Sequence, residues 1–145
     1  MRVQMVFHYL SFRVFIHATE DEERVVKALV FVSGAGEISR TRSSGYHGNP
    51  ITILESTVRG RKNIDAFFDR LGKTNIRELV STLDRRVDDE CTFFLRLDKQ
   101  EAYLERIVLT EKGDVVAVRG KIKAYPCKKP IALETASQYL KSYLE

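Results

Sequence analysis

Residues 40–62, RTRSSGYHGNPITILESTVRGRK, contain the side chains of this sequence that are best suited to binding a polyanion. Arginine offers five N–H donors in a rigid fork that fits phosphate, while tyrosine and histidine rings can stack on unpaired bases. Gly48 allows close approach of a ligand to the backbone. The segment therefore predicts an RNA-binding site with these members: Arg40, Arg42, Tyr46, His47, Gly48, Asn49, Arg59, Arg61 and Lys62.

Several of these side chains have an ordinary structural alternative. Asn49 and His47 are also suited to fixing the loop through side-chain hydrogen bonds to the backbone, which for Asn49 is the favoured interpretation. Arg59 or Arg61 is equally able to pair with Asp65 or with Glu55. Both interpretations stay open at the level of sequence.

A second group of cations lies between residues 115 and 133, where five Lys and Arg residues occur without one acid. Arg119, Lys121 and Lys123 alternate there with small or apolar residues. Because strand residues two apart lie about 6.6 Å from one another on the same face, this pattern predicts a short cationic ladder backed by an apolar face. We add these three residues to the predicted RNA-binding site.

The rest of the chain supplies elements that position these groups. Residues 3–18 alternate like a strand, and Leu10, Phe12, Val14, Ile16 and Ala18 are expected on its buried face. Thr19 and Glu22 match a capping box, which predicts a helix from there to Gly34 or Gly36. Further helices are predicted over 61–71, from Thr74 or Asn75 to 83, after Asp98, and from Pro130 onward, and further strands over 51–58, 91–97, 107–110 and 115–125.

This order of elements predicts a single α+β domain over residues 1–145, with helices on one face of a mixed, mostly antiparallel sheet. The sequence contains no apolar run of the roughly 18 residues that span a bilayer, and nothing in it indicates an oxidising compartment, so a cytoplasmic location is expected. Cys91 and Cys127 are too few and too isolated for a zinc site or a disulfide framework. The three histidines have no metal-ligand spacing, and we expect neither a metal nor another cofactor.

The stretch GYHGNPI, continuing through TILESTVRGRKNIDAFFDRLG, resembles an archaeal family of small RNA-binding proteins that are also described as predicted exosome-related subunits. The fold of that family is similar to that of the large-subunit ribosomal protein that binds 5S RNA. The resemblance implies a cytoplasmic, non-enzymatic RNA-binding protein that forms a homodimer.

The residues themselves leave three classes of function open. No aromatic RNP signature, GxxG clamp or zinc knuckle is present, so we expect recognition of structured or double-stranded RNA through charge and backbone shape. An enzyme would use His47 as general acid or base with Glu55 or Asp65 to hydrolyse a phosphoester, but these spacings define no pocket. The third class is a dimeric adaptor of an RNA-processing or ribosomal complex that does not itself bind RNA.

Overall fold

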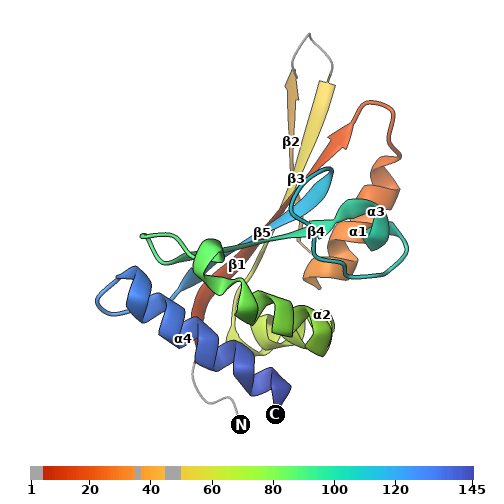
Figure 1. Cartoon of the computed structure of the whole chain (residues 1–145). Helices are drawn as coiled ribbons and strands as arrows, with labels where there is room; N and C mark the ends of the chain where they lie inside the picture. Colours follow the sequence, from red (N-terminus) through yellow and green to blue (C-terminus); the bar gives the residue numbers. More distant parts are fainter. Residues whose placement is uncertain (1–4, 35–36, 45–49) are drawn as a thin grey trace. The chain divides into compact units, whose positions relative to one another are not determined.

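The computed structural model describes residues 5–34, 37–44 and 50–145. Five strands form one antiparallel sheet in the order β2-β3-β1-β5-β4 (Figure 1). The strands are β1 (Phe7–His17), β2 (Ser39–Ser44), β3 (Pro50–Val58), β4 (Thr92–Asp98) and β5 (Val115–Ile122). The helices are α1 (Glu22–Ser33), α2 (Arg61–Ser81), α3 (Lys99–Tyr103) and α4 (Lys129–Lys141), with 3₁₀ turns at Leu83–Arg86 and Ser142–Leu144. The predicted α+β class is confirmed.

The chain divides into two compact units, and strands β1, β4 and β5 contribute residues to both. Unit 1 comprises the described residues within Met1–Leu10, Arg59–Leu95 and Arg119–Glu145. Unit 2 comprises those within Ser11–Val58 and Arg96–Val118. Each unit has its own helices, so each is described by itself below.

In unit 1, helices α2 and α4 lie side by side (Figure 1). An aromatic cluster fills the core between these helices and the strands. The ring of Phe7 stacks on that of Phe68 at a centroid distance of 5.4 Å, and it meets the edge of Tyr139 at 5.8 Å. A Cβ atom at Gly120 of β5 would lie 2.8 Å from both Phe7 and Leu10, so glycine permits this close packing. One face of the unit 1 strands is thereby committed to the core.

In unit 2, α1 packs against β3 and against α3. The stripe predicted for α1 is confirmed, since Val25, Ala28, Leu29 and Val32 are all buried. On β1, Phe12, Val14 and Ile16 are buried and alternate with exposed or half-buried neighbours. The predicted alternation of β1 is therefore correct as far as Ile16. Ala18 is an exception, because β1 ends at His17 and Ala18 lies exposed in the turn that follows.

Helix boundaries differ from the predictions where side-chain hydrogen bonds decide them. The N-cap of α1 is Asp21, whose carboxylate accepts a hydrogen bond from the Glu23 N–H, so the predicted capping box of Thr19 and Glu22 was wrong. The C-cap is Gly34 in the left-handed conformation, as predicted. Within α2, Gly72 has φ 82° and ψ 158°, so the two helices predicted on either side of it meet there in a kink.

Two strand predictions were wrong because pairing partners outweighed local composition. Residues 39–44 are not among the predicted strands, but they form β2 and pair antiparallel with β3, with Arg40 opposite Leu54 and Arg42 opposite Thr52. The strand predicted over residues 107–110 does not form. Their pairing is a single bridge from Leu109 to Leu97 at the end of β4.

The two cysteines, Cys91 and Cys127, lie next to each other in the folded protein. Cys127 and Cys91 are free thiols, and the Cys127 S–H donates a hydrogen bond to Cys91 Sγ at 2.7 Å. They are thus neighbours, although their separation in sequence had suggested that they are isolated.

Among the described residues, no helix is long and apolar enough to cross a membrane.

Candidate nucleic-acid interface

The predicted cationic ladder lies on β5 and just beyond its end. Val118, Gly120 and Ile122 are buried in the core, whereas Arg119 is exposed and Lys121 is half-buried. Lys123 follows the strand, and its backbone N–H donates to Val6 O at 2.7 Å. The alternation places these cations opposite the core, on the face of the unit 1 strands that we call the open face.

Two arginines of unit 1 lie over aromatic rings rather than beside acids. The guanidinium carbon of Arg119 is 5.5 Å from the ring centroid of Phe94 on β4. That of Arg59, which follows β3, is also 5.5 Å from the ring centroid of Tyr9 on β1. Within the part of the chain that the structure describes, no carboxylate forms an ion pair with either guanidinium. Both positive charges therefore remain available to an anionic ligand.

The strand order explains how these pairs come to share the open face. Phe94 is 37% exposed, and its neighbours Phe93 and Leu95 are buried in the core. On β1, His8 and Tyr9 both separate the buried Phe7 from the buried Leu10, so the alternation slips by one residue, as at a β-bulge. Tyr9 contacts Arg59 and lies on β1, the strand next to β5, which carries Arg119 and Lys121.

Arg61 and Lys62 are exposed in the first turn of α2. The N-cap, Gly60, has no side chain that could accept hydrogen bonds from the first N–H groups of α2. These N–H groups therefore add positive potential beside Arg61 and Lys62. Arg61 Nε lies 3.7 Å from Asp65 Oδ2, which confirms the ion pair that the sequence allowed for one of these arginines. Lys62 consequently contributes more free charge to this end of α2 than Arg61 does.

In unit 2, Arg40 and Arg42 are exposed on β2. Their register with Leu54 and Thr52, which are both buried, places them on the α1 side of β3. Arg40 Nε accordingly lies 3.8 Å from Glu22 Oε1 at the start of α1. These two arginines face away from Arg13, whose Nη2 bonds Glu55 Oε2 at 3.2 Å on the opposite side of the strands of unit 2.

Four predicted site residues, Tyr46, His47, Gly48 and Asn49, lie outside the described residues. The acids that an enzyme would pair with His47 have other partners. Glu55 is paired with Arg13, as described above. Asp65 Oδ1 accepts a hydrogen bond of 2.5 Å from Tyr139 OH, and Tyr143 OH lies 3.3 Å from the same oxygen. Asp65 thus links α2 to α4 within unit 1, which is a structural role.

A cluster that the sequence did not suggest surrounds Lys99 in unit 2. The Lys99 side chain is fully buried, and its ammonium group donates to Phe15 O and Glu20 Oε1, each at 2.7 Å, and lies 2.9 Å from Asp114 Oδ2. Tyr103 OH donates to the second oxygen of Glu20 at 2.7 Å. Burial alone would raise the pKa of Glu20, but hydrogen bonds from the His17 N–H, Lys99 and Tyr103 hold the pKa at about 2.

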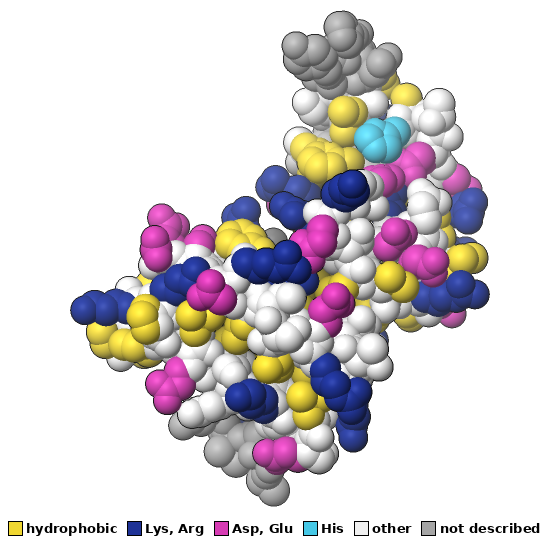
Figure 2. Space-filling model, viewed as in Figure 1, with side chains coloured by type: hydrophobic (Ala, Val, Ile, Leu, Met, Phe, Trp, Pro, Cys, Tyr) yellow, Lys and Arg dark blue, Asp and Glu magenta, His cyan; other side chains and the backbone are white. Residues whose placement is uncertain are grey.

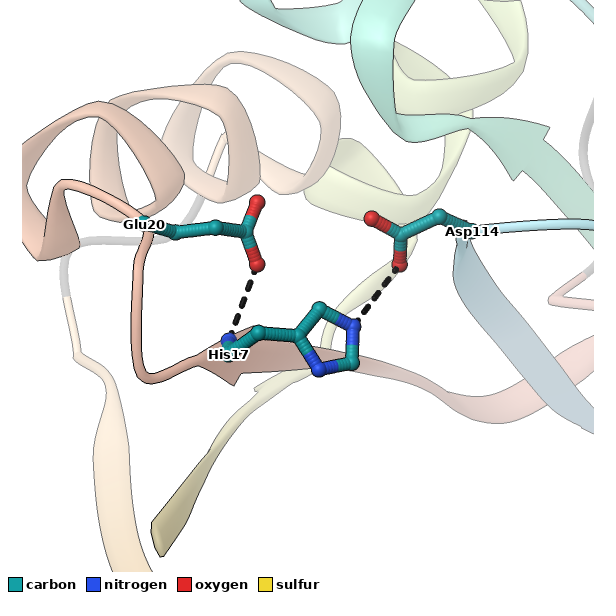
Figure 3. Close-up of side chains that lie close together, drawn as sticks. All are labelled: His17, Glu20 and Asp114. Carbon is teal, nitrogen blue, oxygen red and sulfur yellow. Dashed lines mark hydrogen bonds and ion pairs between the residues drawn. The ribbon is translucent and has the colours of Figure 1, made fainter. Parts of the chain in front are cut away.

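The same cluster offers three potential metal ligands, His17, Glu20 and Asp114, with ligand atoms within 4.8 Å of one another (Figure 3). His17 Nε2 lies 3.9 Å from Asp114 Oδ1. The ammonium group of Lys99 already contacts both carboxylates and supplies the positive charge that a metal ion would bring. We therefore assign this cluster to the structure of unit 2 and not to a metal.

The net charge of +4 is not spread as one uniform field. On the face seen in Figure 2, Lys and Arg side chains are interspersed with Asp and Glu, and apolar side chains lie between them. A local arrangement of cations must therefore define any anion site.

Most cations of the open face were predicted from the sequence as members of the RNA-binding site. The aromatic residue Phe94 was not predicted there, because the sequence showed it only as part of a strand. Phe94 lies between Phe93 and Leu95, which both enter the core, and this alternation was the sequence signal that its ring lies on the open face.

An α+β domain whose open sheet face presents cations and aromatic rings is typical of proteins that bind nucleic acids. Comparison with known families gives the same class. The chain belongs to the family described as RNA binding, whose model matches residues 9–122. The family resemblance found in the sequence is thereby confirmed.

Individual relatives cover most of the chain. RNA-binding protein PAB1135 of Pyrococcus abyssi is 36% identical over 148 aligned positions, which cover 92% of this chain and 93% of the relative. Uncharacterized protein MJ0213 of Methanocaldococcus jannaschii is 32% identical and covers 78% of this chain and 83% of its own length. The solved structure of Mth689, a DUF54 protein from Methanothermobacter thermautotrophicus, has a TM-score of 0.81 at 32% identity and covers 94% of this chain and 99% of its own.

Proposed function

We propose that this chain is a non-catalytic, cytoplasmic RNA-binding protein that contacts the phosphate backbone of structured RNA through the open face of unit 1. The observation that supports this most directly is the pairing of Arg59 and Arg119 with aromatic rings while neither has an acidic partner in the described residues. Arginines held in this way keep their donors for phosphate and lose little side-chain freedom on binding. Family membership supports RNA over other polyanions.

The spacing of the cations fits a chain of phosphates better than a single anion. Arg119, Lys121 and Lys123 follow one another at strand spacing, and Arg59 lies across β1 from them. Lys121 also donates a hydrogen bond to Glu90 O, which fixes the position of its ammonium group. Cations in such a row are able to neutralise several phosphates of one nucleic-acid strand.

A salt series with fluorescence-anisotropy detection tests this function. The probes are a hairpin RNA, a single-stranded RNA and a matched duplex DNA. A steep loss of affinity with rising salt is expected, because each phosphate contact releases a counterion and steepens the log–log slope by about one. Replacing Arg59, Arg119, Lys121 and Lys123 together by Gln should make this slope shallower by up to about four.

The matched control replaces four exposed cations elsewhere, Lys27, Arg77, Lys112 and Lys141, by Gln. Both variants lose the same net charge, so a general attraction to RNA would weaken equally in both. Equal weakening would contradict the open face as the site. Absence of binding by the wild-type protein at low salt would favour the adaptor function, in which the basic surface contacts acidic proteins.

Homodimer formation and a link to an RNA-processing complex such as the exosome belong to the same proposal. Phe15 of unit 2 is 41% exposed, and a second copy of this chain is able to cover its ring. Sedimentation velocity of the free protein and of its RNA complex measures the stoichiometry. A protein that sediments as a monomer at high concentration would contradict the dimer.

A further inference from the structure

We infer that the open face of unit 1 selects RNA containing unpaired nucleotides, because the arginine–aromatic pairs at Tyr9 and Phe94 form platforms on which exposed bases stack. This inference rests on the proposed RNA-binding function and deepens it. Charge and backbone shape alone would make a continuous duplex the preferred ligand. The side chains on the open face indicate a different preference.

The first step concerns the cost of exposing aromatic side chains. Phe94 lies 37% exposed on β4, directly between two core residues, and its ring has Arg119 above it. A phenyl ring in that position lies outside the core, and it cannot form a hydrogen bond with a phosphate. A ring of this kind can stack on a base, and such stacking strengthens the binding of proteins that recognise single strands.

The second step concerns the arginines. A guanidinium group is planar and stacks on bases as well as on aromatic side chains, so an arginine above a ring extends the stacking surface. Arg59 with Tyr9 and Arg119 with Phe94 are two such pairs. Tyr9 lies on β1 and Phe94 on β4, and β5, which carries Arg119 and Lys121, runs between these two strands.

The third step concerns which RNA offers a base to these pairs. In a continuous A-form duplex the bases are stacked on one another, the major groove is too narrow for side chains, and only phosphates and ribose hydroxyls are accessible. A bulge, loop or junction presents an unstacked base next to a helical backbone. Such an RNA satisfies both the cations and the aromatic rings of the open face.

The test compares a continuous RNA duplex with the same duplex interrupted by a short bulge that contains 2-aminopurine. Wild-type protein is expected to bind the bulged RNA about tenfold more tightly, the preference that roughly one stacked base supplies. Binding should also change the 2-aminopurine fluorescence, which reports on stacking directly. Phe94→Leu and Tyr9→Leu keep an apolar side chain and remove the ring, so each should reduce the preference with little change in duplex binding.

Phe15→Leu is the matched control, since Phe15 is similarly exposed but belongs to unit 2. It should leave the preference unchanged. If Tyr9→Leu proves unstable in thermal melting, Phe94→Leu decides alone. Equal affinity of wild-type protein for both RNAs, or a preference that survives Phe94→Leu, would overturn the inference and leave the proposed function standing. No binding of either RNA would overturn both.

Discussion

The ammonium nitrogen of Lys99 lies 2.7 Å from Oε1 of Glu20, although 79 positions separate the two residues. Lys99 opens the short helix α3, and Glu20 lies in the turn between β1 and α1. The pair therefore links the start of α3 to the turn before α1, two helices that also pack against each other within unit 2. A buried cation that holds two carboxylates is a strong constraint on how this unit folds, which leads to the first two predictions.

Replacing Lys99 by Met should lower the free energy of unfolding by about 3 kcal/mol, because removing one partner leaves Glu20 and Asp114 without their shared cation. The loss is expected near the lower end of the range for buried pairs, since Asp114 is partly exposed and can be hydrated. Urea denaturation followed by circular dichroism measures it. The control Lys112→Met changes an exposed lysine and should alter stability by less than about 0.5 kcal/mol. A loss below about 1 kcal/mol for Lys99→Met would contradict the prediction.

The stability that Glu20 contributes should depend on pH in the acid range. Its pKa in the folded protein is lowered from the ordinary value of 4.5 to about 2, so folding favours the carboxylate. The contribution is therefore complete above pH 4.5, falls as the pH decreases toward 2 and is lost below that value; it amounts to about 3 kcal/mol. The difference in unfolding free energy between wild type and Glu20→Gln should shrink over this window. A difference that stays constant from pH 4.5 to 2 would refute this assignment.

Asp65 is expected to act on stability and not on catalysis. Tyr139→Phe removes the 2.5 Å hydrogen bond to Asp65 and should cost about 1.5–3 kcal/mol, the range for a hydrogen bond to a charged group. Chemical denaturation gives the value. Tyr125→Phe removes a hydroxyl from a side chain that is 77% exposed and serves as the control. If both variants were equally stable, the hydrogen bond would not contribute to unit 1.

The two neighbouring thiols should differ sharply in reactivity. Burial, together with the hydrogen bond from Cys127, raises the pKa of Cys91 to about 11, so its reactive thiolate is scarce near neutral pH. Cys127 is exposed. Iodoacetamide at pH 8 should therefore modify Cys127 first in the native protein, as judged by peptide mass spectrometry. In Cys127→Ser, modification should wait for unfolding in urea, and rapid labelling of native Cys91 would contradict its burial.

Local sequence determined the helices and most of the sheet of this protein. The 3.6-residue stripes of α1, α2 and α4 and the alternation of β1 and β5 follow from which residues must be buried, so they are visible without a structure. The helix end predicted at Gly34 or Gly36 lies at Gly34, and the break predicted after residue 71 lies at Gly72; both glycines have a positive φ, which glycine adopts without steric cost. The cations of β5 were likewise evident, since alternation with core residues fixes their face.

Contacts between distant segments decided what the sequence left open. Strand β2 exists because β3 supplies its hydrogen-bond partners, and its polar composition gave no sign of this. The sequence allowed Arg59 an acidic partner, but the order of the strands places it over Tyr9 instead. Lys99 is buried only because α3 brings it to Glu20 and Asp114. Composition and spacing determine which groups a chain possesses, whereas burial and pairing depend on segments that meet only when it folds.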